Sequence, residues 1–158
     1  LILCGRCRNL KKDEETEMKI ILIAVLIILF IGTIKCIPVN FSKKVFERKQ
    51  KERMKELESQ RENANTWAIA TSVGFVFWLI QMVVYTKIGM EFKEHTDILI
   101  LSILQIVMCI YGVLRCPEET KKMYLGIGVQ YRRFWQILET VLNMVYYPLA
   151  IYWMIKSF

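Results

Sequence analysis

Four long stretches of the sequence are almost free of charge, and they constrain the fold more than any other feature. They are residues 20–34, 67–85, 98–114 and 134–155. Only the last contains a charged residue, Glu139. A helix that crosses a bilayer needs about 20 predominantly apolar residues, or somewhat fewer when lysines at its ends reach the headgroups. The second and fourth stretches meet that length alone, and the other two meet it with their flanking residues.

The sequence therefore predicts an all-α, multi-pass transmembrane bundle. Its four spans are expected at about residues 19–37, 66–86, 97–115 and 134–156, within one membrane domain over residues 1–158. The spans must be helices, because a bilayer interior offers no partner for unpaired backbone groups. A soluble bundle is excluded, because 158 residues are too few to cover four apolar helices. The low Gly, Pro and Cys contents exclude collagen-like and disulfide-framework chains.

The first apolar stretch also resembles a secretory signal peptide. From Met18 the sequence runs MKIILIAVLIILFIGTIKC, a basic start followed by an apolar core. Seventeen residues precede that methionine, which argues against a signal peptide. We therefore expect this stretch to be retained as the first membrane helix.

The distribution of lysine and arginine predicts how the chain is oriented. The loops at residues 35–65 and 115–133 hold fourteen of the 22 basic residues, and the other side holds eight. Loops rich in Lys and Arg stay on the cytosolic or matrix side. We expect both loops there and both termini opposite, in an organelle membrane such as the mitochondrial inner membrane or the endoplasmic reticulum. No stacking aromatic residues interleave with the basic run, so no nucleic-acid partner is predicted.

The polar segment at residues 40–63 is predicted to be a charged helical loop. It contains neither Gly nor Pro and is rich in helix formers. Its apolar residues are too sparse for a self-sufficient coiled coil. It is either a solvated helix or an arm that docks on a partner or on anionic lipid headgroups. The basic residues of such an arm are Lys43, Lys44, Arg48, Lys51 and Arg53.

Three helix starts are predicted from residue patterns typical of a first turn or an N-cap. Residues 117–119 read Pro-Glu-Glu, which is typical of the first turn of a short helix. Thr66 and Asp97 stand where the N-caps of the second and third spans are expected.

Small and polar residues in the last three stretches share one face of each helix, because they recur every three or four residues. The faces are Thr71, Gly74, Trp78, Gln81 and Tyr85; Ser102, Gln105, Cys109 and Gly112; and Gln136, Glu139 or Thr140, Asn143, and Tyr146 or Tyr147. Such faces are predicted to pack against neighbouring helices, since lipid rejects amides. The alternative is an intramembrane polar cavity for a ligand, lipid headgroup or ion, lined by Gln81, Gln105, Glu139 and Asn143.

Glu139 is the only charged residue inside a predicted span. It lies about 8 Å into its helix, at about 1.5 Å per residue. A carboxylate at that depth is costly, which makes it a candidate site residue. The alternative is a structural role, in which Glu139 reaches the interface or pairs with Arg132 or Arg133.

No motif in the sequence indicates a particular reaction, metal or cofactor. Cys4 and Cys7 form a lone CxxC pair, whereas a zinc site needs four ligands. His95 is predicted to be a solvated loop residue. The signatures of nucleotide-binding proteins, serine hydrolases and zinc proteases are absent. We therefore predict no catalytic, metal or cofactor site, and the sequence favours a protein that is not an enzyme.

A short sequence motif lies at the end of the first apolar stretch. It reads GTIKCIP over residues 32–38, followed by Ser42-Lys43-Lys44. This resembles the DoxX-like family of four-helix membrane proteins, in particular its NACHO-type receptor assembly chaperones. The resemblance implies a four-helix bundle that helps a larger complex to assemble. Residues 75–77 lack the family's acidic residue and Tyr111 stands near its histidine, so no functional residue is carried over.

Three functions are consistent with these features. The first is a non-enzymatic accessory subunit or assembly factor of a larger membrane complex, with membrane lipids and other membrane subunits as partners. Packing faces, short loops and the lack of a catalytic constellation favour it. The second is a protein or enzyme that binds a lipid or small hydrophobic ligand in the polar cavity. The third is a channel-like oligomer.

Overall fold

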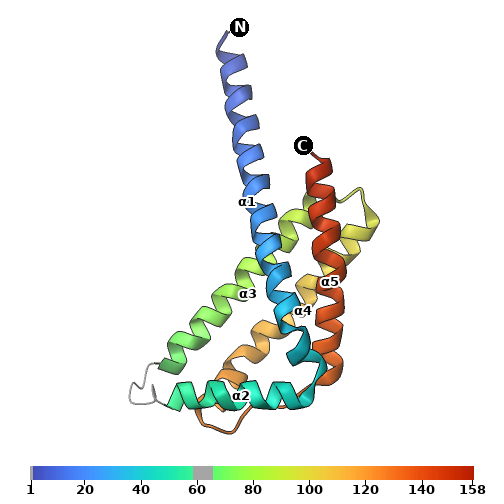
Figure 1. Ribbon diagram of the computed structural model, residues 1–158. Helices are drawn as coiled ribbons and strands as arrows, with labels where there is room; N and C mark the ends of the chain where they lie inside the picture. Colours follow the sequence, from blue (N-terminus) through green and yellow to red (C-terminus); the bar gives the residue numbers. More distant parts are fainter. Residues whose placement is uncertain (1, 59–65) are drawn as a thin grey trace.

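All regular secondary structure in the described part of the computed structural model is helical (Figure 1). The structure describes the backbone of residues 2–58 and 66–158 and the side chains of residues 16–58 and 68–158. The helices are α1 (Ile2–Phe41), α2 (Lys43–Glu58), α3 (Thr66–Glu91), α4 (Thr96–Tyr124) and α5 (Arg133–Lys156). The predicted all-α class is confirmed. The side chains of the CxxC pair and of Thr66, and residues 59–63 of the charged segment, lie outside what the structure describes.

Three helical segments in the described residues are long and apolar enough to cross a membrane. They are Thr16–Phe41, Ala68–Glu91 and Thr96–Tyr124. Helix α5 is not among them, although its 24 residues extend for about 36 Å. Its tyrosines and tryptophans, together with Glu139, Asn143 and Pro148, lower its mean hydropathy. Three apolar helices of spanning length are therefore present where the sequence predicts four.

Helix α4 does not end near residue 115. It continues through Pro117 to Tyr124, so the separate short helix predicted at residues 117–119 is wrong. Proline removes only one backbone donor from the helix. Ion pairs between residues four apart support the turns around it. These pairs are Arg115–Glu119 and Glu118–Lys122.

The start of α4 also differs from the prediction. His95, not Asp97, occupies the N-cap position, and Asp97 lies in the first turn. A carboxylate there still faces the positive end of the helix dipole. His95 is not a solvated loop residue, because its ring stacks on Trp153 with the centroids 3.7 Å apart.

Ser42 separates α1 from α2. The backbone nitrogen of Val45 lies 3.5 Å from the Ser42 hydroxyl oxygen, and that of Phe46 lies 2.9 Å from the Ser42 carbonyl oxygen. A serine hydroxyl in this position satisfies a donor that the first turn leaves unpaired. The charged segment is therefore helical, over Lys43–Glu58 in the described residues.

The four long helices form two pairs. Helix α3 packs along α4, and α1 packs along α5, while α4 and α5 make the main contact between the pairs. The N-terminal end of α1 and the C-terminus lie toward one end of the molecule (Figure 1). The α4–α5 connection lies at the other end, and α2 runs across it. We call this second end the basic end.

A cluster of three buried tyrosines joins the helix pairs near the C-terminus. This tyrosine cluster comprises Tyr85, Tyr146 and Tyr147, each at most 1% exposed. The hydroxyls of Tyr85 and Tyr147 lie 2.8 Å apart, and the Tyr146 hydroxyl lies 3.2 Å from Ser102 Oγ. The Tyr85 and Tyr146 rings meet edge to face at 5.1 Å, an arrangement that stabilises beyond burial alone. The cluster links α3, α4 and α5.

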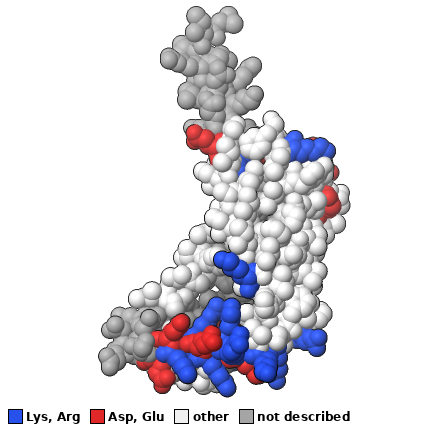
Figure 2. All heavy atoms as spheres, viewed as in Figure 1, with Lys and Arg blue, Asp and Glu red and all other residues white. Residues whose placement is uncertain are grey.

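Charged side chains gather toward the two ends of the molecule, and the band between them is largely uncharged (Figure 2). Large apolar side chains are exposed within the helices of this band, among them Ile28, Val73 and Val83. Contiguous exposed apolar surface of this kind marks membrane or partner contact. The surface is that expected of an integral membrane protein.

Candidate functional site

The amides that were predicted to line a polar site lie inside the bundle. Gln81 and Gln105 are 8% and 2% exposed. Gln105 Nε2 donates to Asn143 Oδ1 at 2.7 Å, which joins α4 to α5. The Cys109 thiol lies 3.8 Å from Gln81 Oε1, which joins α4 to α3. The glutamines thus bind other partners rather than each other, in interhelical bonds of a kind worth about 0.6 kcal/mol.

A cavity of about 560 Å³ lies between the helix pairs at the basic end. All five helices and the α4–α5 connection contribute to its wall. Its volume is in the range of small-molecule sites, roughly 300–1,000 Å³. Of the four residues predicted to line a polar site, Glu139 is in this wall, whereas Gln81, Gln105 and Asn143 are not.

The floor of the cavity is held by bonds between distant segments. Gln50 Nε2 on α2 donates to the Val129 carbonyl oxygen at 2.9 Å. The Tyr131 hydroxyl donates to the Asn40 carbonyl oxygen at 2.7 Å, and Asn40 Nδ2 donates to Thr140 Oγ1 at 2.9 Å. These bonds connect α1, α2, the α4–α5 connection and α5.

Two arginines in the wall converge on one tyrosine hydroxyl. Arg115 Nη1 lies 2.6 Å and Arg132 Nη1 lies 3.0 Å from the Tyr111 oxygen, so the two nitrogens are at most 5.6 Å apart, the sum of those distances. The Tyr111 ring stacks on Trp135 at 4.9 Å, which orients the hydroxyl. Arg115 also pairs with Glu119 at 2.8 Å. Arg132 has no ion pair with a described acidic residue.

Two further cations line the same cavity from α2. Lys49 and Arg53 lie one turn apart, and neither pairs with an acid in the described part of the chain. The wall therefore holds four cations against two carboxylates, those of Glu119 and Glu139, which is an excess of two positive charges. Like charges gathered around one cavity disfavour each other, although of these four cations Lys49, Arg53 and Arg132 are exposed and only Arg115 is largely withdrawn from solvent. The basic side of the cavity is suited to an anionic group.

The α5 wall has the opposite character. Glu139 does not form the predicted ion pair with Arg132 or Arg133, because Arg132 binds Tyr111 and Arg133 lines the outer face of α5. One turn before Glu139, the Gln136 Oε1 atom is buried and has no hydrogen-bond partner among the described atoms. This wall presents hydrogen-bond acceptors to whatever enters the cavity.

The side of the cavity away from the basic end is apolar and aromatic. Trp78 of α3 packs against Gly112 of α4, where an added Cβ would lie 2.7 Å from the indole. Met108 extends this surface, whereas Ala70, near the start of α3, lines the cavity closer to the basic end (Figure 1). Helices α1 and α3 diverge toward the basic end (Figure 1), and both contribute to the wall.

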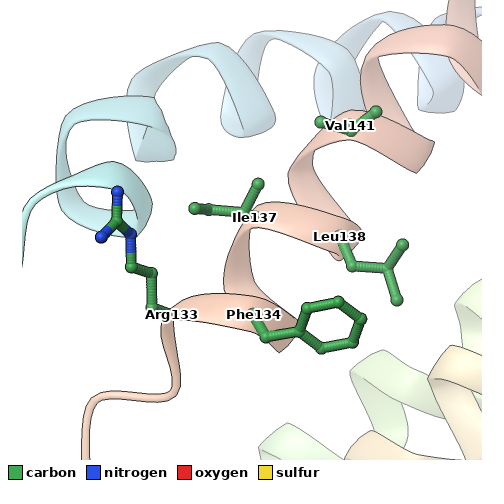
Figure 3. Close-up of a pocket in the computed structure, with 5 residues that line it drawn as sticks. All are labelled: Arg133, Phe134, Ile137, Leu138 and Val141. Atoms are coloured by element: carbon green, nitrogen blue, oxygen red, sulfur yellow. The ribbon is translucent and has the colours of Figure 1, made fainter.

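A second, more open pocket of about 500 Å³ lies on the outer face of α5 (Figure 3). All the lining side chains come from the first turns of this helix, and all but one are apolar. They are Arg133, Phe134, Ile137, Leu138 and Val141. This pocket brings together no set of polar groups, so it is a weaker candidate site than the cavity.

The five basic residues predicted to form an arm do not all lie on the same face of α2. Arg53 lines the cavity, whereas the other four residues are exposed and outside its wall, namely Lys43, Lys44, Arg48 and Lys51. Lys49 and Gln50 also line the cavity, although neither was predicted as a site residue. Helical spacing places residues 46, 49, 50, 53 and 57 on one face, but that face becomes informative only once α2 is known to form a floor.

Within the described residues, no three His, Cys, Asp or Glu side chains lie close enough together to hold a metal ion. Comparison with known proteins finds no family model that matches the chain, no similar curated protein and no similar solved structure.

Proposed function

We propose that this chain is an integral membrane protein of four spans that binds an amphiphilic, lipid-like ligand in the cavity at its basic end. One observation carries the proposal: the wall is apolar and aromatic on one side and cationic on the other. An amphiphile presents the same two surfaces. The cavity is large enough for a headgroup and the glycerol below it, and acyl chains would lie along the exposed apolar helices.

The proposal takes α5 as a fourth span. This helix packs along α1 and exposes apolar side chains such as Val141, Val145 and Ile155. Trp135, Tyr152 and Trp153 lie near the two ends of this helix, where aromatic residues are favourable at membrane interfaces, and Tyr146 and Tyr147 are buried within the bundle. Four spans place the loops at 35–65 and 115–133 on one side, which the basic excess assigns to the cytosol or matrix of an organelle membrane.

Thiol labelling tests this topology. Single cysteines are introduced at Lys44, Lys121 and Ser157, all exposed, in a chain whose five native cysteines are replaced. We expect a membrane-impermeant reagent to reach positions 44 and 121 from one side of the membrane and position 157 from the other. Labelling of 157 together with 121 from one side would show that α5 does not cross.

Ligand binding in the cavity is tested by filling it. Ala70→Trp places an indole in the wall, and Ala68→Trp places the same side chain on an exposed part of α3 outside the wall. We expect Ala70→Trp to lower the amount of co-purified lipid about tenfold, the equivalent of roughly 1.4 kcal/mol. Ala68→Trp should retain the wild-type amount. Mass spectrometry of lipid extracts measures both, and equal retention would rule out the cavity as the site.

One observation favours a second candidate function, an accessory subunit or assembly factor of a larger membrane complex. Helix α3 exposes a stripe of large apolar residues along its first half, including Ile69, Val73, Val76 and Ile80. A neighbouring subunit would cover such a stripe, and the resemblance to DoxX-like assembly proteins implies the same kind of role. Ligand binding and assembly are compatible in one protein.

A further inference from the structure

We infer that the ligand's polar group is a phosphate ester, held between Arg132 and Arg53 at the basic end of the cavity. This inference rests on the proposed function, because it names the class of amphiphile that the cavity takes: a phospholipid.

The convergence of two guanidinium groups is the first step. Arg115 and Arg132 meet at the Tyr111 hydroxyl, and among the described residues Arg115 has a carboxylate partner, Glu119, whereas Arg132 has none. A hydroxyl oxygen accepts hydrogen bonds but does not neutralise charge. An anion beside Arg132 would relieve the repulsion between the two cations, and guanidinium groups bind phosphate oxygens through paired N–H bonds.

The directions from which the cations approach favour phosphate over carboxylate. Lys49 and Arg53 come from α2, Arg115 comes from α4, and Arg132 comes from the α4–α5 connection. A carboxylate has two oxygens in one plane. A phosphate monoester, such as that of phosphatidic acid, distributes its charge over about three terminal oxygens around a tetrahedral centre, so it can accept from donors on several sides at once.

Of the two carboxylates in the wall, Glu119 pairs with Arg115, and it is Glu139, without an ion pair among the described residues, that determines where the phosphate lies. Glu139 is on α5, one to two turns beyond the helix start, whereas Arg132 precedes that start. An anion placed deeper in the cavity would meet the Glu139 carboxylate, which disfavours it. The phosphate therefore lies toward the basic end, and the uncharged remainder of the ligand extends past Glu139 toward Trp78 and Met108.

The chain provides a matched control for this site. Arg132 and Arg133 are adjacent and carry the same charge, but Arg132 lines the cavity and Arg133 lines the outer pocket of α5 (Figure 3). Both side chains belong to exposed residues, so Arg132→Gln and Arg133→Gln are expected to fold equally well. The two variants change net charge identically and differ in the face they alter and in the loss of the Arg132–Tyr111 hydrogen bond.

Binding is measured on the full chain in detergent micelles through the fluorescence of its tryptophans, two of which, Trp78 and Trp135, line the cavity. The probes are dioctanoyl phosphatidic acid, dioctanoylglycerol and glycerol 3-phosphate. We expect phosphatidic acid to bind about tenfold more tightly than either of the others. Arg132→Gln should weaken phosphatidic acid about tenfold and leave dioctanoylglycerol unchanged, as expected for the loss of a hydrogen bond to a charged group. Arg133→Gln should change neither.

Each contrary result overturns a different step. Equal binding of glycerol 3-phosphate and phosphatidic acid would make the ligand a soluble phosphate ester rather than a lipid. Equal binding of phosphatidic acid and dioctanoylglycerol, unaffected by Arg132→Gln, would overturn the phosphate site and leave the amphiphile proposal standing. Equal weakening by Arg132→Gln and Arg133→Gln would assign the effect to net charge. Failure of both lipids to bind, with no effect of Ala70→Trp on co-purified lipid, would overturn the proposed function itself.

Discussion

Replacing Gly112 with alanine is expected to lower the free energy of unfolding by about 1–2 kcal/mol. An added Cβ would lie 2.7 Å from the Trp78 ring, and the ring cannot bend away as a flexible chain end would. Overpacking of this kind costs roughly 1–3 kcal/mol. Alanine recovers at most about 1 kcal/mol of that through its higher helix propensity. The close approach of α3 and α4 thus depends on the absence of a side chain at position 112.

Gly32→Ala is the matched control for that substitution. Gly32 also lies within an apolar helix, but nothing lies within 4 Å of an added Cβ. We expect it to leave the free energy of unfolding unchanged or to raise it by up to about 1 kcal/mol. SDS titration in mixed micelles measures both variants. Equal effects would show that α3 and α4 do not approach as closely as described.

A second substitution identifies the clash as the cause. In the Gly112→Ala background, Trp78→Leu removes the ring that the new methyl group would meet. The double variant should be more stable than the sum of the two single effects predicts, since residues in contact couple by about 0.5–3 kcal/mol. Strict additivity would place the destabilisation elsewhere.

The helices of this protein follow from its uncharged stretches, whereas their ends do not. Each predicted span lies within one of the observed long helices, because apolar runs of that length leave few alternatives. The end of α4 was mispredicted because Pro117 was interpreted as part of the first turn of a separate short helix. Nearby ion pairs between residues four apart support the helix through Pro117, and their contribution is not visible in a pattern of single residues.

The packing faces were also predictable, because their residues recur every three or four positions along each helix. Tyr85, Ser102, Gln105 and Tyr146 all belong to the faces that helical spacing assigned to the bundle, and all are buried. The partner of each polar group was not predictable. Gln105 binds Asn143 rather than Gln81, because the rotation of each helix about its axis determines which amides meet.

The cavity was the least predictable part of the site. Its wall is assembled from segments as far apart as Arg53 and Arg132, and the bulk charge count could only place those residues on the same side. A basic excess that indicates topology and a basic cluster that faces inward look identical in a sequence. The structure distinguishes the two kinds of basic residue, because the Tyr111 hydroxyl accepts hydrogen bonds from both Arg115 and Arg132.

Removing one hydroxyl of the Tyr85–Tyr147 pair is expected to cost more than removing both. The two oxygens lie 2.8 Å apart, and each side chain is at most 1% exposed. Tyr147→Phe leaves the Tyr85 hydroxyl buried without the partner it has in the structure. An unsatisfied buried polar group costs about 1–3 kcal/mol, whereas replacing both partners with apolar groups of the same shape is nearly neutral.

The Tyr85→Phe/Tyr147→Phe double variant should therefore recover most of the stability that Tyr147→Phe loses. Tyr152→Phe is the control, because Tyr152 lies on the same helix but is exposed, and surface substitutions stay within about 0.5 kcal/mol. SDS titration of wild type, Tyr85→Phe, Tyr147→Phe and the double variant gives the coupling energy, and Tyr152→Phe is measured beside them. If the double variant instead loses the sum of the single losses, the hydroxyls do not depend on each other. The link that the tyrosine cluster makes between α3 and α5 would then be one of ring packing alone.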